Sequence, residues 1–452
     1  MRGAGWKGAA ARAVGALSRR SGRGGTSLPG KLLLRLDPHA IATLSRGLNR
    51  SGVISATNGK TTTAAMVAAI LERGGARLVS NRAGANMAGG VAGALLSEEG
   101  DTGLFEVDEF WLGPIVAELR AGGTVALLLA NLFRDQLDRY GELESIADRW
   151  AEIVDAGHAD ALVLNADDPL VADLGRSRED VTFFGVEDLA LATPALQHAS
   201  DSTHCRRCGA PYVYEAVFLG HLGHYHCPNA DAQRPVPTIT AHDVHLDGVR
   251  GARFELRTPA GAAAIALPLP GLYNVYNALG AAALALALGA PLRDVVAGLE
   301  AVSPAFGRAE TVAVQGHDVS IMLVKNPAGA NEVLRTLALE DGQHDLLAVL
   351  NDQIADGRDV SWIWDADFET LAPRLRRAVC AGSRAPEMAL RLKYAGVPAS
   401  AIAVEPALGP ALDDALAGAP AGGRVFALPT YTAMLALREE LVRRGVAGSS
   451  FS

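Results

Sequence analysis

Aromatic residues, cysteines and long hydrophobic runs are all scarce in this sequence. Aromatic residues make up 5% of 452 positions while glycine occurs 49 times, which favours α/β packing with glycine turns over an all-β sandwich. Four cysteines are too few for a disulfide scaffold. The most apolar stretch, Leu279 to Leu292, is shorter than the roughly 18–20 residues that a membrane span needs, so we expect it to form a buried helix.

Positive charge is also in short supply, except near the N-terminus. The formal net charge of −9 argues against general affinity for polyanions, so we expect no nucleic-acid partner. Residues 1–50 nevertheless hold ten Lys and Arg against one acid, Asp37. Apolar residues from Trp6 to Leu17 recur there at helical spacing, which predicts either a solvated basic helix or a helix resting on an anionic membrane face. No secretory signal is expected, because an apolar core with a cleavage site is missing, and we predict a cytoplasmic protein with peripheral contact at the inner membrane face as a hypothesis.

The length of the chain predicts about two or three domains. Short β-like runs alternate with helix-like stretches, which is typical of βαβ units and a mostly parallel sheet. We expect a basic N-terminal segment at 1–47, a central α/β domain at 48–310 with an insertion at 201–235, and a smaller Rossmann-like α/β domain at 311–452. The expected strands are 53–56, 103–107, 124–130, 161–165, 319–324, 345–350, 378–381 and 424–427, and the expected central helices include 61–73 and 146–156.

The strongest motif runs from Val53 to Thr63, where an apolar strand leads through a tight glycine turn into a helix. Backbone N–H groups at such a helix start cradle phosphates, Lys60 would neutralise the β and γ oxygens, and Thr61 can reach Mg²⁺. The strict Walker pattern wants glycine at position 54, where this chain has Ile54, but the order of strand, turn and helix still predicts ATP binding. The predicted ATP-binding residues of this loop are Thr57, Asn58, Gly59, Lys60, Thr61 and Thr62.

Acidic residues follow the next expected strand. Carboxylates that leave a sheet beside a phosphate loop suit Mg²⁺, a hard ion that prefers oxygen ligands. Glu106 is the predicted magnesium ligand together with Thr61, and the alternative is a solvated acidic turn. Asp108 and Glu109 are weaker candidates for the same role.

Further motifs follow in an order that resembles the Mur ligase family of ATP-dependent peptide-forming ligases. These motifs are Asn131–Tyr140, Asn165–Pro169, Gly271–Asn277 and Gly307–Glu310. The resemblance implies that Asn131 and Asn277 contact adenine and that Arg308 contacts the nucleotide. Two positions depart from the family pattern: Ala56 replaces a glycine of the phosphate loop, and Gln136 stands where histidine is usual.

One branch of that family is more similar than the others. About 50 residues precede the phosphate loop, too few for the UDP-binding domain of ordinary Mur ligases. The motifs at 81–87, 325–329 and 351–365 are similar to those of synthetase subunits of lipid II isoglutaminyl synthases. This resemblance implies that ATP and Mg²⁺ are used to phosphorylate the α-carboxylate of D-glutamate in the lipid II stem peptide. Ammonia would then come from a separate glutaminase of the GatD type, docked on the C-terminal domain in a heterodimer.

The same resemblance gives Asp359 a role in catalysis, as the acid that completes the glutaminase's Cys–His pair. From the residues alone, the favoured interpretation of Asp359 is a helix N-cap ahead of Val360–Trp364, and its choice over Asp352 and Asp356 as a catalytic acid rests on the resemblance. No nucleophile is evident within this chain, because Cys380 lies in an apolar strand and is expected to be a buried structural thiol.

The remaining cysteines are typical of a zinc ribbon with one ligand missing. Cys205, Cys208 and Cys227 have the spacing of metal ligands, and residues 212–218 would form the connecting hairpin. Ala230 occupies the fourth position and cannot bind metal. A structural zinc site completed by Asp231 or by a histidine, a ribbon fold without metal, and incidental cysteines all remain open; the histidines nearby are His204, His221, His224 and His226.

Two other functions fit parts of the sequence. A stand-alone amino-acid ligase of the Mur or folylpolyglutamate type would need no partner, but the missing UDP-binding domain and the Asp359 motif count against it. A non-catalytic nucleotide-binding scaffold is the second alternative. It has no need to keep Lys60, Thr61 and Glu106, which this chain retains.

Overall fold

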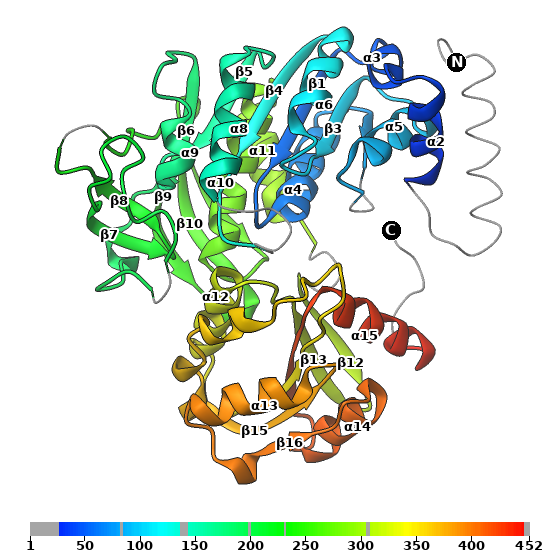
Figure 1. Ribbon diagram of the computed structural model, residues 1–452, viewed down its shortest axis with the longest axis vertical. Coiled ribbons are helices and arrows are strands. Elements are labelled where there is room, and N and C mark those ends of the chain that lie inside the picture. Colours follow the sequence, from blue (N-terminus) through cyan, green and yellow to red (C-terminus); the bar gives the residue numbers. More distant parts are fainter. Residues whose placement is uncertain are drawn as a thin grey trace.

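The computed structural model describes residues 27–81, 85–135, 143–197, 200–229, 232–303 and 308–446. Figure 1 shows two lobes, one built on the sheet of the central domain and the other, coloured yellow to red, on the sheet of the C-terminal domain. The expected basic helix between Trp6 and Leu17 lies outside the described residues. Within the described ranges, no helix is long and apolar enough to cross a membrane.

The central domain has a nine-stranded sheet in the order β11-β10-β9-β6-β5-β4-β1-β3-β2. Neighbouring strands from β9 to β2 run parallel, and β10 and β11 add antiparallel strands at one edge. The strands are β1 Arg50–Ser55, β2 Leu78–Ser80, β3 Thr102–Glu106, β4 Thr124–Leu129, β5 Ala161–Asn165, β6 Val181–Val186, β9 Ile239–Leu246, β10 Ala252–Thr258 and β11 Gly261–Leu267. The expected strands of this domain and its mostly parallel sheet are therefore confirmed.

Helices cover both faces of this sheet, which explains why its central strands are apolar at almost every position. Ile54 and Leu128 face the side of α4 and α10, whereas Val53 and Leu127 face the side of α6 and α8. The helices of the domain are α2 Leu28–Leu36, α3 Ala40–Ser45, α4 Lys60–Arg73, α5 Ala88–Ser97, α6 Leu112–Leu119, α8 Leu143–Asp155, α9 Pro169–Asp173, α10 Leu272–Ala287 and α11 Leu292–Glu300.

The apolar run Leu279–Leu292 does not form one helix as expected. Helix α10 begins earlier and ends at Ala287, and α11 begins at Leu292. The break between them contains Gly289, whose φ of 86° is left-handed, and Pro291, which cannot donate a backbone hydrogen bond. The run is buried from Leu279 to Ala285 and again at Leu288, whereas Ala287 is exposed.

The insertion contains a two-stranded antiparallel sheet, formed by β7 Val213–Leu219 and β8 Leu222–His226. This is the expected hairpin, and it brings the flanking cysteine segments together. Short 3₁₀ helices occur at Arg120–Gly122, Leu189–Leu191, Gly248–Arg250, Ser361–Trp364, Phe368–Thr370, Ala372–Arg374 and Ala399–Ala401.

The C-terminal domain has a six-stranded sheet in the order β12-β13-β17-β14-β15-β16, parallel except for β12. The predicted boundary at residue 310 falls inside β12, which already pairs with β13 from Arg308. The elements are β12 Arg308–Val314, β13 His317–Met322, α12 Pro327–Ala338, β14 His344–Val349, β15 Leu375–Ala381, α13 Ala385–Tyr394, β16 Ile402–Val404, α14 Leu408–Gly418, β17 Arg424–Pro429 and α15 Tyr431–Arg443. Figure 1 places α12 where the two lobes meet.

A fully buried carboxylate ties the carboxyl end of β5 to three other parts of the central domain. Asp167 accepts hydrogen bonds from Arg234 Nε at 2.6 Å, from the Tyr276 hydroxyl at 2.6 Å and from Val186 N at 2.9 Å. These donors come from the end of the insertion, α10 and β6. Because both oxygens are satisfied, the buried charge is stabilised by its partners.

We therefore predict that Asp167→Ala lowers the free energy of unfolding by about 3–5 kcal/mol, since it leaves Arg234 and Tyr276 without their buried acceptor. Urea denaturation followed by circular dichroism measures this loss. The control is Asp180→Ala, which removes an exposed ion pair with Arg178 and should have a much smaller effect. Equal losses in the two variants would contradict the role given to Asp167.

Candidate active site

A cavity of about 390 Å³ lies between the two domains. Its central-domain wall is formed by the phosphate loop, the acidic end of β3 and the segment after β4. Its C-terminal wall is formed by the segment that joins β13 to α12 and by the first turns of α12. The cavity lining includes Thr57, Asn58, Gly59, Lys60, Thr61, Thr62, Glu106, Asn131 and Asn277. Nearly all predicted ATP and magnesium residues are therefore brought together.

The phosphate loop makes a turn that only glycine can occupy. Gly59 has a φ of 86° and immediately precedes α4. A Cβ atom there would lie 2.1 Å from Asn277 Oδ1, so a side chain is excluded by space as well as by conformation. The turn directs the first N–H groups of α4 into the cavity wall, where the helix dipole favours an anion.

Asn131 holds this loop from the end of β4. Its Oδ1 accepts from Asn58 N at 2.9 Å, and its Nδ2 donates to the Asn58 carbonyl at 3.0 Å. Thr57 is held on the same segment, because Phe133 N donates to its hydroxyl at 3.0 Å. Asn277 donates from Nδ2 to Asn274 Oδ1 at 3.0 Å. Both predicted adenine contacts therefore lie beside the loop, and their contact with adenine stays a prediction.

Arg308, the third residue assigned to the nucleotide by resemblance, begins β12. Its backbone pairs with Met322, which lines the cavity, but its side chain lies outside the described part of the chain. Gln136, the departure from the family pattern, also lies outside the described residues.

Lys60 is held among carboxylates at the floor of the cavity. Its Nζ donates to Glu109 Oε1 at 2.9 Å and also to the Ala56 carbonyl. Burial opposes the charge on Lys60, but Glu109, Asp108 and Asp135 outweigh this effect, so the pKa of Lys60 lies above its ordinary value. A fully charged lysine is thus available to a triphosphate, which would compete with Glu109 for it.

Thr61 and Glu106, the two predicted magnesium ligands, lie next to each other. The Thr61 hydroxyl donates to Glu106 Oε2 at 2.7 Å, and Glu106 is 4% exposed. Asn81 fixes the end of β3, because its Oδ1 accepts from Glu106 N at 3.1 Å and its Nδ2 donates to the Glu106 carbonyl at 2.8 Å. A hydroxyl and buried carboxylate oxygens at a phosphate loop fit Mg²⁺.

Two residues of the C-terminal domain contact the phosphate loop, Lys325 from the cavity lining and Asn326 beside it, although sequence analysis noted them only as part of a motif. Lys325 Nζ donates to the Thr57 carbonyl at 3.1 Å and pairs with Asp135. Asn326 Nδ2 donates to Asn58 Oδ1 at 3.1 Å, and Asn326 Oδ1 caps α12 by accepting from Gly329 N at 2.9 Å. Sequence gave no signal that these residues would meet the loop, because the contact is made between domains.

Asp359 lies apart from the cavity, on the exposed surface of the C-terminal domain. Its Oδ1 accepts from Ser361 N at 2.8 Å, ahead of the 3₁₀ turn at Ser361–Trp364. The N-cap of that turn is Val360, so Asp359 makes a local hydrogen bond one residue before the cap and is not the N-cap itself. This hydrogen bond lowers the pKa of Asp359 and keeps it ionised at neutral pH.

The two neighbouring acids have partners of their own. Asp356 is 4% exposed and accepts from Thr432 N at 2.7 Å, and its second oxygen accepts from Gln353 N at 3.2 Å. Asp352 accepts from the Ser383 hydroxyl at 2.7 Å. Asp359 is therefore the acid of this loop that is exposed and bound only by Ser361, which is compatible with a role toward another molecule.

Large apolar side chains are exposed on the segment that carries Asp359 and on neighbouring α13. Ile354 is 73% exposed, Trp364 is 45% exposed and Tyr394 is 70% exposed, and the Trp364 and Tyr394 rings lie with centroids 5.8 Å apart. Paired exposed aromatic rings such as Trp364 and Tyr394 are typical of a surface that contacts another protein.

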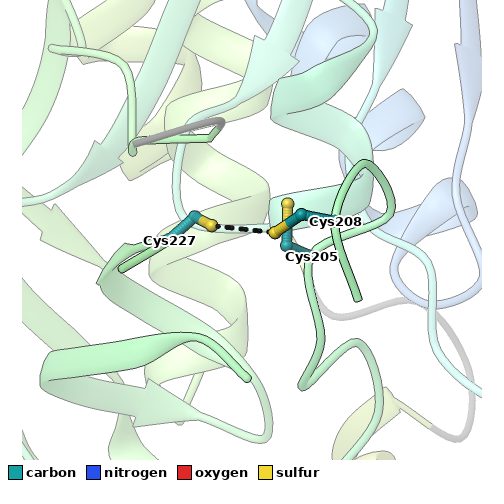
Figure 2. Close-up of side chains that lie close together, drawn as sticks. All are labelled: Cys205, Cys208 and Cys227. Carbon is teal, nitrogen blue, oxygen red and sulfur yellow. Dashed lines mark hydrogen bonds between the residues drawn. The ribbon is translucent and has the colours of Figure 1, made fainter. Parts of the chain in front are cut away.

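The three ribbon cysteines converge, as Figure 2 shows, with Cys205 and Cys208 on one loop facing Cys227. Their sulfur atoms all lie within 4.8 Å of one another, and Cys208 and Cys227 are 3.4 Å apart. Three thiols at these separations fit a tetrahedral zinc ion. Asp231 lies outside the described residues, so its part in the site stays a prediction.

The nearby histidines do not complete this group within the described residues. His226 Nδ1 lies 3.4 Å from Glu215, and His224 Nε2 is 2.9 Å from the Val186 carbonyl. His221 is fully buried beside Asp168, and His204 contacts Thr203. The fourth cysteine of the chain, Cys380, is fully buried and burial raises the pKa of its thiol to about 12, which confirms a structural thiol.

Two sequence profiles of known families match this chain. The Mur ligase middle domain matches residues 54–233, and the MurT ligase C-terminal domain matches residues 323–434. Among solved structures, a pseudomurein peptide ligase type C from Methanothermus fervidus superposes with a TM-score of 0.69 at 25% identity, covering 88% of this chain and 79% of that one. MurF from Acinetobacter baumannii superposes with a TM-score of 0.65 at 20% identity, covering 92% and 80% of the two chains, and shows the shared fold.

Curated relatives match nearly the whole length. The MurT subunit of the glutamine-hydrolysing lipid II isoglutaminyl synthase of Staphylococcus aureus strain N315 is 30% identical over 442 residues, which cover 96% of each chain. The corresponding subunit of Streptococcus pneumoniae is 32% identical over 440 residues, which cover 94% of each chain. With an α/β fold, a phosphate loop and a C-terminal domain that all agree with these matches, the chain belongs to the MurT family of Mur ligases.

Proposed function

We propose that this chain is the synthetase subunit of a lipid II isoglutaminyl synthase, a ligase of peptidoglycan synthesis. It would use ATP and Mg²⁺ to amidate the α-carboxylate of D-glutamate in the lipid II stem peptide. The observation that carries this proposal is the interdomain cavity, where Lys60, Thr61 and Glu106 line the same wall as the phosphate loop. The similarity to MurT subunits over 96% of the chain supports the choice of acceptor.

The proposed reaction has two steps. A carboxylate oxygen of D-glutamate attacks the γ-phosphorus of ATP, the bond between the γ-phosphorus and the β,γ-bridging oxygen breaks, and ADP leaves. The nitrogen of ammonia then attacks the acyl carbon, the bond to phosphate breaks, and the amide, phosphate and a proton result. Lys60 and the N–H groups at the start of α4 would stabilise negative charge on the transferred group. A bound Mg²⁺, held by Thr61 and Glu106, would neutralise phosphate oxygens.

Ammonia would be produced by a separate glutaminase of the GatD type, docked on the surface formed by Ile354, Trp364 and Tyr394. Asp359 is exposed on the same segment and ionised. An exposed carboxylate there could accept a hydrogen bond from the partner's catalytic histidine and orient its ring. The cysteine group would be a structural zinc site, and the basic segment 1–47 would contact the anionic membrane face that carries the lipid-linked acceptor.

The first prediction concerns the reaction itself. Co-expressed with a GatD-type glutaminase, the chain should convert lipid II to its D-isoglutamine form with ATP and glutamine, as measured by mass spectrometry. Lys60→Met should reduce amidation roughly a hundredfold or more with either glutamine or ammonium, because it removes a charge that stabilises the transferred phosphoryl group. Ligation of an amino acid without the partner would identify a stand-alone ligase instead. ATP binding without any turnover would identify a scaffold.

The second prediction tests whether Asp359 serves the glutaminase reaction and not the synthetase reaction. Asp359→Asn should lose glutamine-driven amidation and keep ammonium-driven amidation, because asparagine can still accept the hydrogen bond from Ser361 N but carries no charge for a histidine. Asp352→Asn, on the same loop and bound to Ser383, is the matched control and should keep both activities. Equal glutamine-driven rates in the two variants would remove Asp359 from the glutaminase site.

The third prediction concerns zinc. The purified chain should contain about one equivalent of zinc by inductively coupled plasma mass spectrometry, and Cys208→Ser should lose most of it. Cys380→Ala is the control and should keep the metal, since this thiol is buried in the other domain. Asp231→Ala should speed the loss of zinc to a chelator if Asp231 completes the site. A metal content that is negligible in all four proteins would leave a ribbon without metal.

A further inference from the structure

The ribbon hairpin joins the three converging cysteines to the wall of the cavity. Leu219 ends β7 and Leu222 begins β8, and both residues line the cavity. Cys227 follows β8 directly and faces Cys208 (Figure 2). The extended chain from Leu222 to Cys227 spans about 17 Å. One short element therefore has thiols at its base and a part of the cavity wall at its tip.

The tip of this hairpin packs against the segment that holds the phosphate loop. The ring of His221, which is fully buried, lies with its centroid 4.7 Å from that of Phe133. Gly220 has a φ of 57°, and a Cβ atom there would lie 3.0 Å from Phe133 Cε1. Phe133 N in turn donates to the Thr57 hydroxyl at 3.0 Å. A displaced tip would therefore disturb Phe133 and, through it, the start of the phosphate loop.

Packed aromatic side chains connect the thiols to the tip. Cys205, Cys227 and Tyr225 belong to one buried cluster. The Tyr214 ring lies with its centroid 6.1 Å from that of Tyr225, and the Tyr214 hydroxyl donates to the His221 carbonyl at 2.8 Å. Because close-packed side chains transmit strain and absorb little of it, a movement at the cysteines would reach His221.

Two of the cysteines lie close enough to react with each other. Cys208 Sγ is 3.4 Å from Cys227 Sγ, and Cys208 is exposed. The sulfur atoms of a disulfide are about 2.05 Å apart, so its formation would bring these two about 1.4 Å closer. Ala230 leaves the motif without the fourth cysteine of a closed zinc ribbon. An oxidant therefore meets an exposed thiol that has a second thiol beside it.

We propose that hydrogen peroxide oxidises Cys208 and Cys227 to a reversible disulfide, and that this disulfide lowers the amidation rate by moving the tip of the hairpin. The Cys208 sulfur attacks one peroxide oxygen, an S–O bond forms as the O–O bond breaks, and a sulfenic acid and water result. The Cys227 sulfur then attacks the Cys208 sulfur, an S–S bond forms as the S–O bond breaks, and a second water leaves.

The balance of this reaction is complete. Two thiols lose two electrons and their two protons, and one peroxide is reduced to two waters. A zinc ion held by these thiols would be released, because a disulfide sulfur is no longer a thiolate ligand. The effect on amidation rests on the proposed function, whereas formation of the disulfide does not.

The test uses the purified complex with ammonium in place of glutamine, so that oxidation of the glutaminase's own cysteine does not affect the measurement. Hydrogen peroxide should produce a Cys208–Cys227 cross-link in peptide mass spectrometry and release zinc to a chromogenic chelator. It should also speed hydrogen exchange in the peptide that spans Leu219 to Leu222.

The ammonium-driven rate should fall roughly tenfold or more on oxidation, since a displacement of about 1 Å near reacting groups can cost up to about a hundredfold. Dithiothreitol and added zinc should restore it, because the disulfide is reducible. Two variants are compared with the wild type through the ratio of the rates before and after peroxide.

Cys227→Ser keeps both thiols of the facing loop but removes the one attached to β8, so its ratio should stay near one whatever its starting rate. Cys380→Ala is the matched control, because this thiol is buried in the other domain, and it should respond as the wild type does. The cross-link and the hydrogen exchange are measured on the wild type itself, so a Cys227→Ser variant that folds poorly leaves the test intact.

Two results would overturn the inference. One is an oxidised wild type in which the cross-link is absent or joins other cysteines. The other is a cross-linked wild type whose ammonium-driven rate is unchanged. A reduced wild type without any ammonium-driven amidation would instead contradict the proposed function, and hydrogen exchange at the tip of the hairpin would then decide whether the disulfide moves it.

Discussion

The left-handed turn at Gly59 is the constraint on which the cavity depends. It leaves no space for a Cβ atom, because Asn277 Oδ1 fills that position, and it begins α4 with its N–H groups toward the cavity. Asn58, the preceding residue, is held by Asn131 from the central domain and by Asn326 from the C-terminal domain. Asparagines from three separate elements thus fix a short loop whose shape determines where a phosphate can lie.

Several contacts between the domains are polar, beside apolar ones such as those of Val249 and Ala328. Lys325 binds Asp135, Arg335 binds the Phe218 carbonyl, and Glu340 binds Val249 N. Each such hydrogen bond contributes about 1 kcal/mol net, because water can replace it when the domains separate. Polar contacts of this kind can separate at low cost, so they would not prevent the two domains from moving apart.

Sequence patterns predicted the elements that depend on local signals. The phosphate loop, the ribbon hairpin and eight strands of the two large sheets were predicted closely, because apolar runs and glycine turns define them over a few residues. The other strands of these sheets, β2, β6, β9, β10, β11, β12 and β16, were not predicted. The run Leu279–Leu292 was predicted as one helix because most of its residues are apolar. Its division into two helices at Gly289 and Pro291 was missed. Lys325, Asn326 and Glu332 were not assigned to the site, because their importance arises only when α12 meets the other domain.

Two carboxylates illustrate why side chains with few hydrogen-bond partners are informative. Asp359 is exposed and kept charged by a backbone N–H, although its own chain offers it little else to bind. Glu332 is buried, and burial opposes the negative charge on its carboxylate. Its Oε1 atom has no hydrogen-bond donor among the described residues that would stabilise this charge. A folded chain gains little from either arrangement alone. Each would become favourable if another molecule supplied the missing donor, as proposed for a partner's histidine beside Asp359. Residues that the fold leaves incompletely bonded are therefore good candidates for contacts with other molecules.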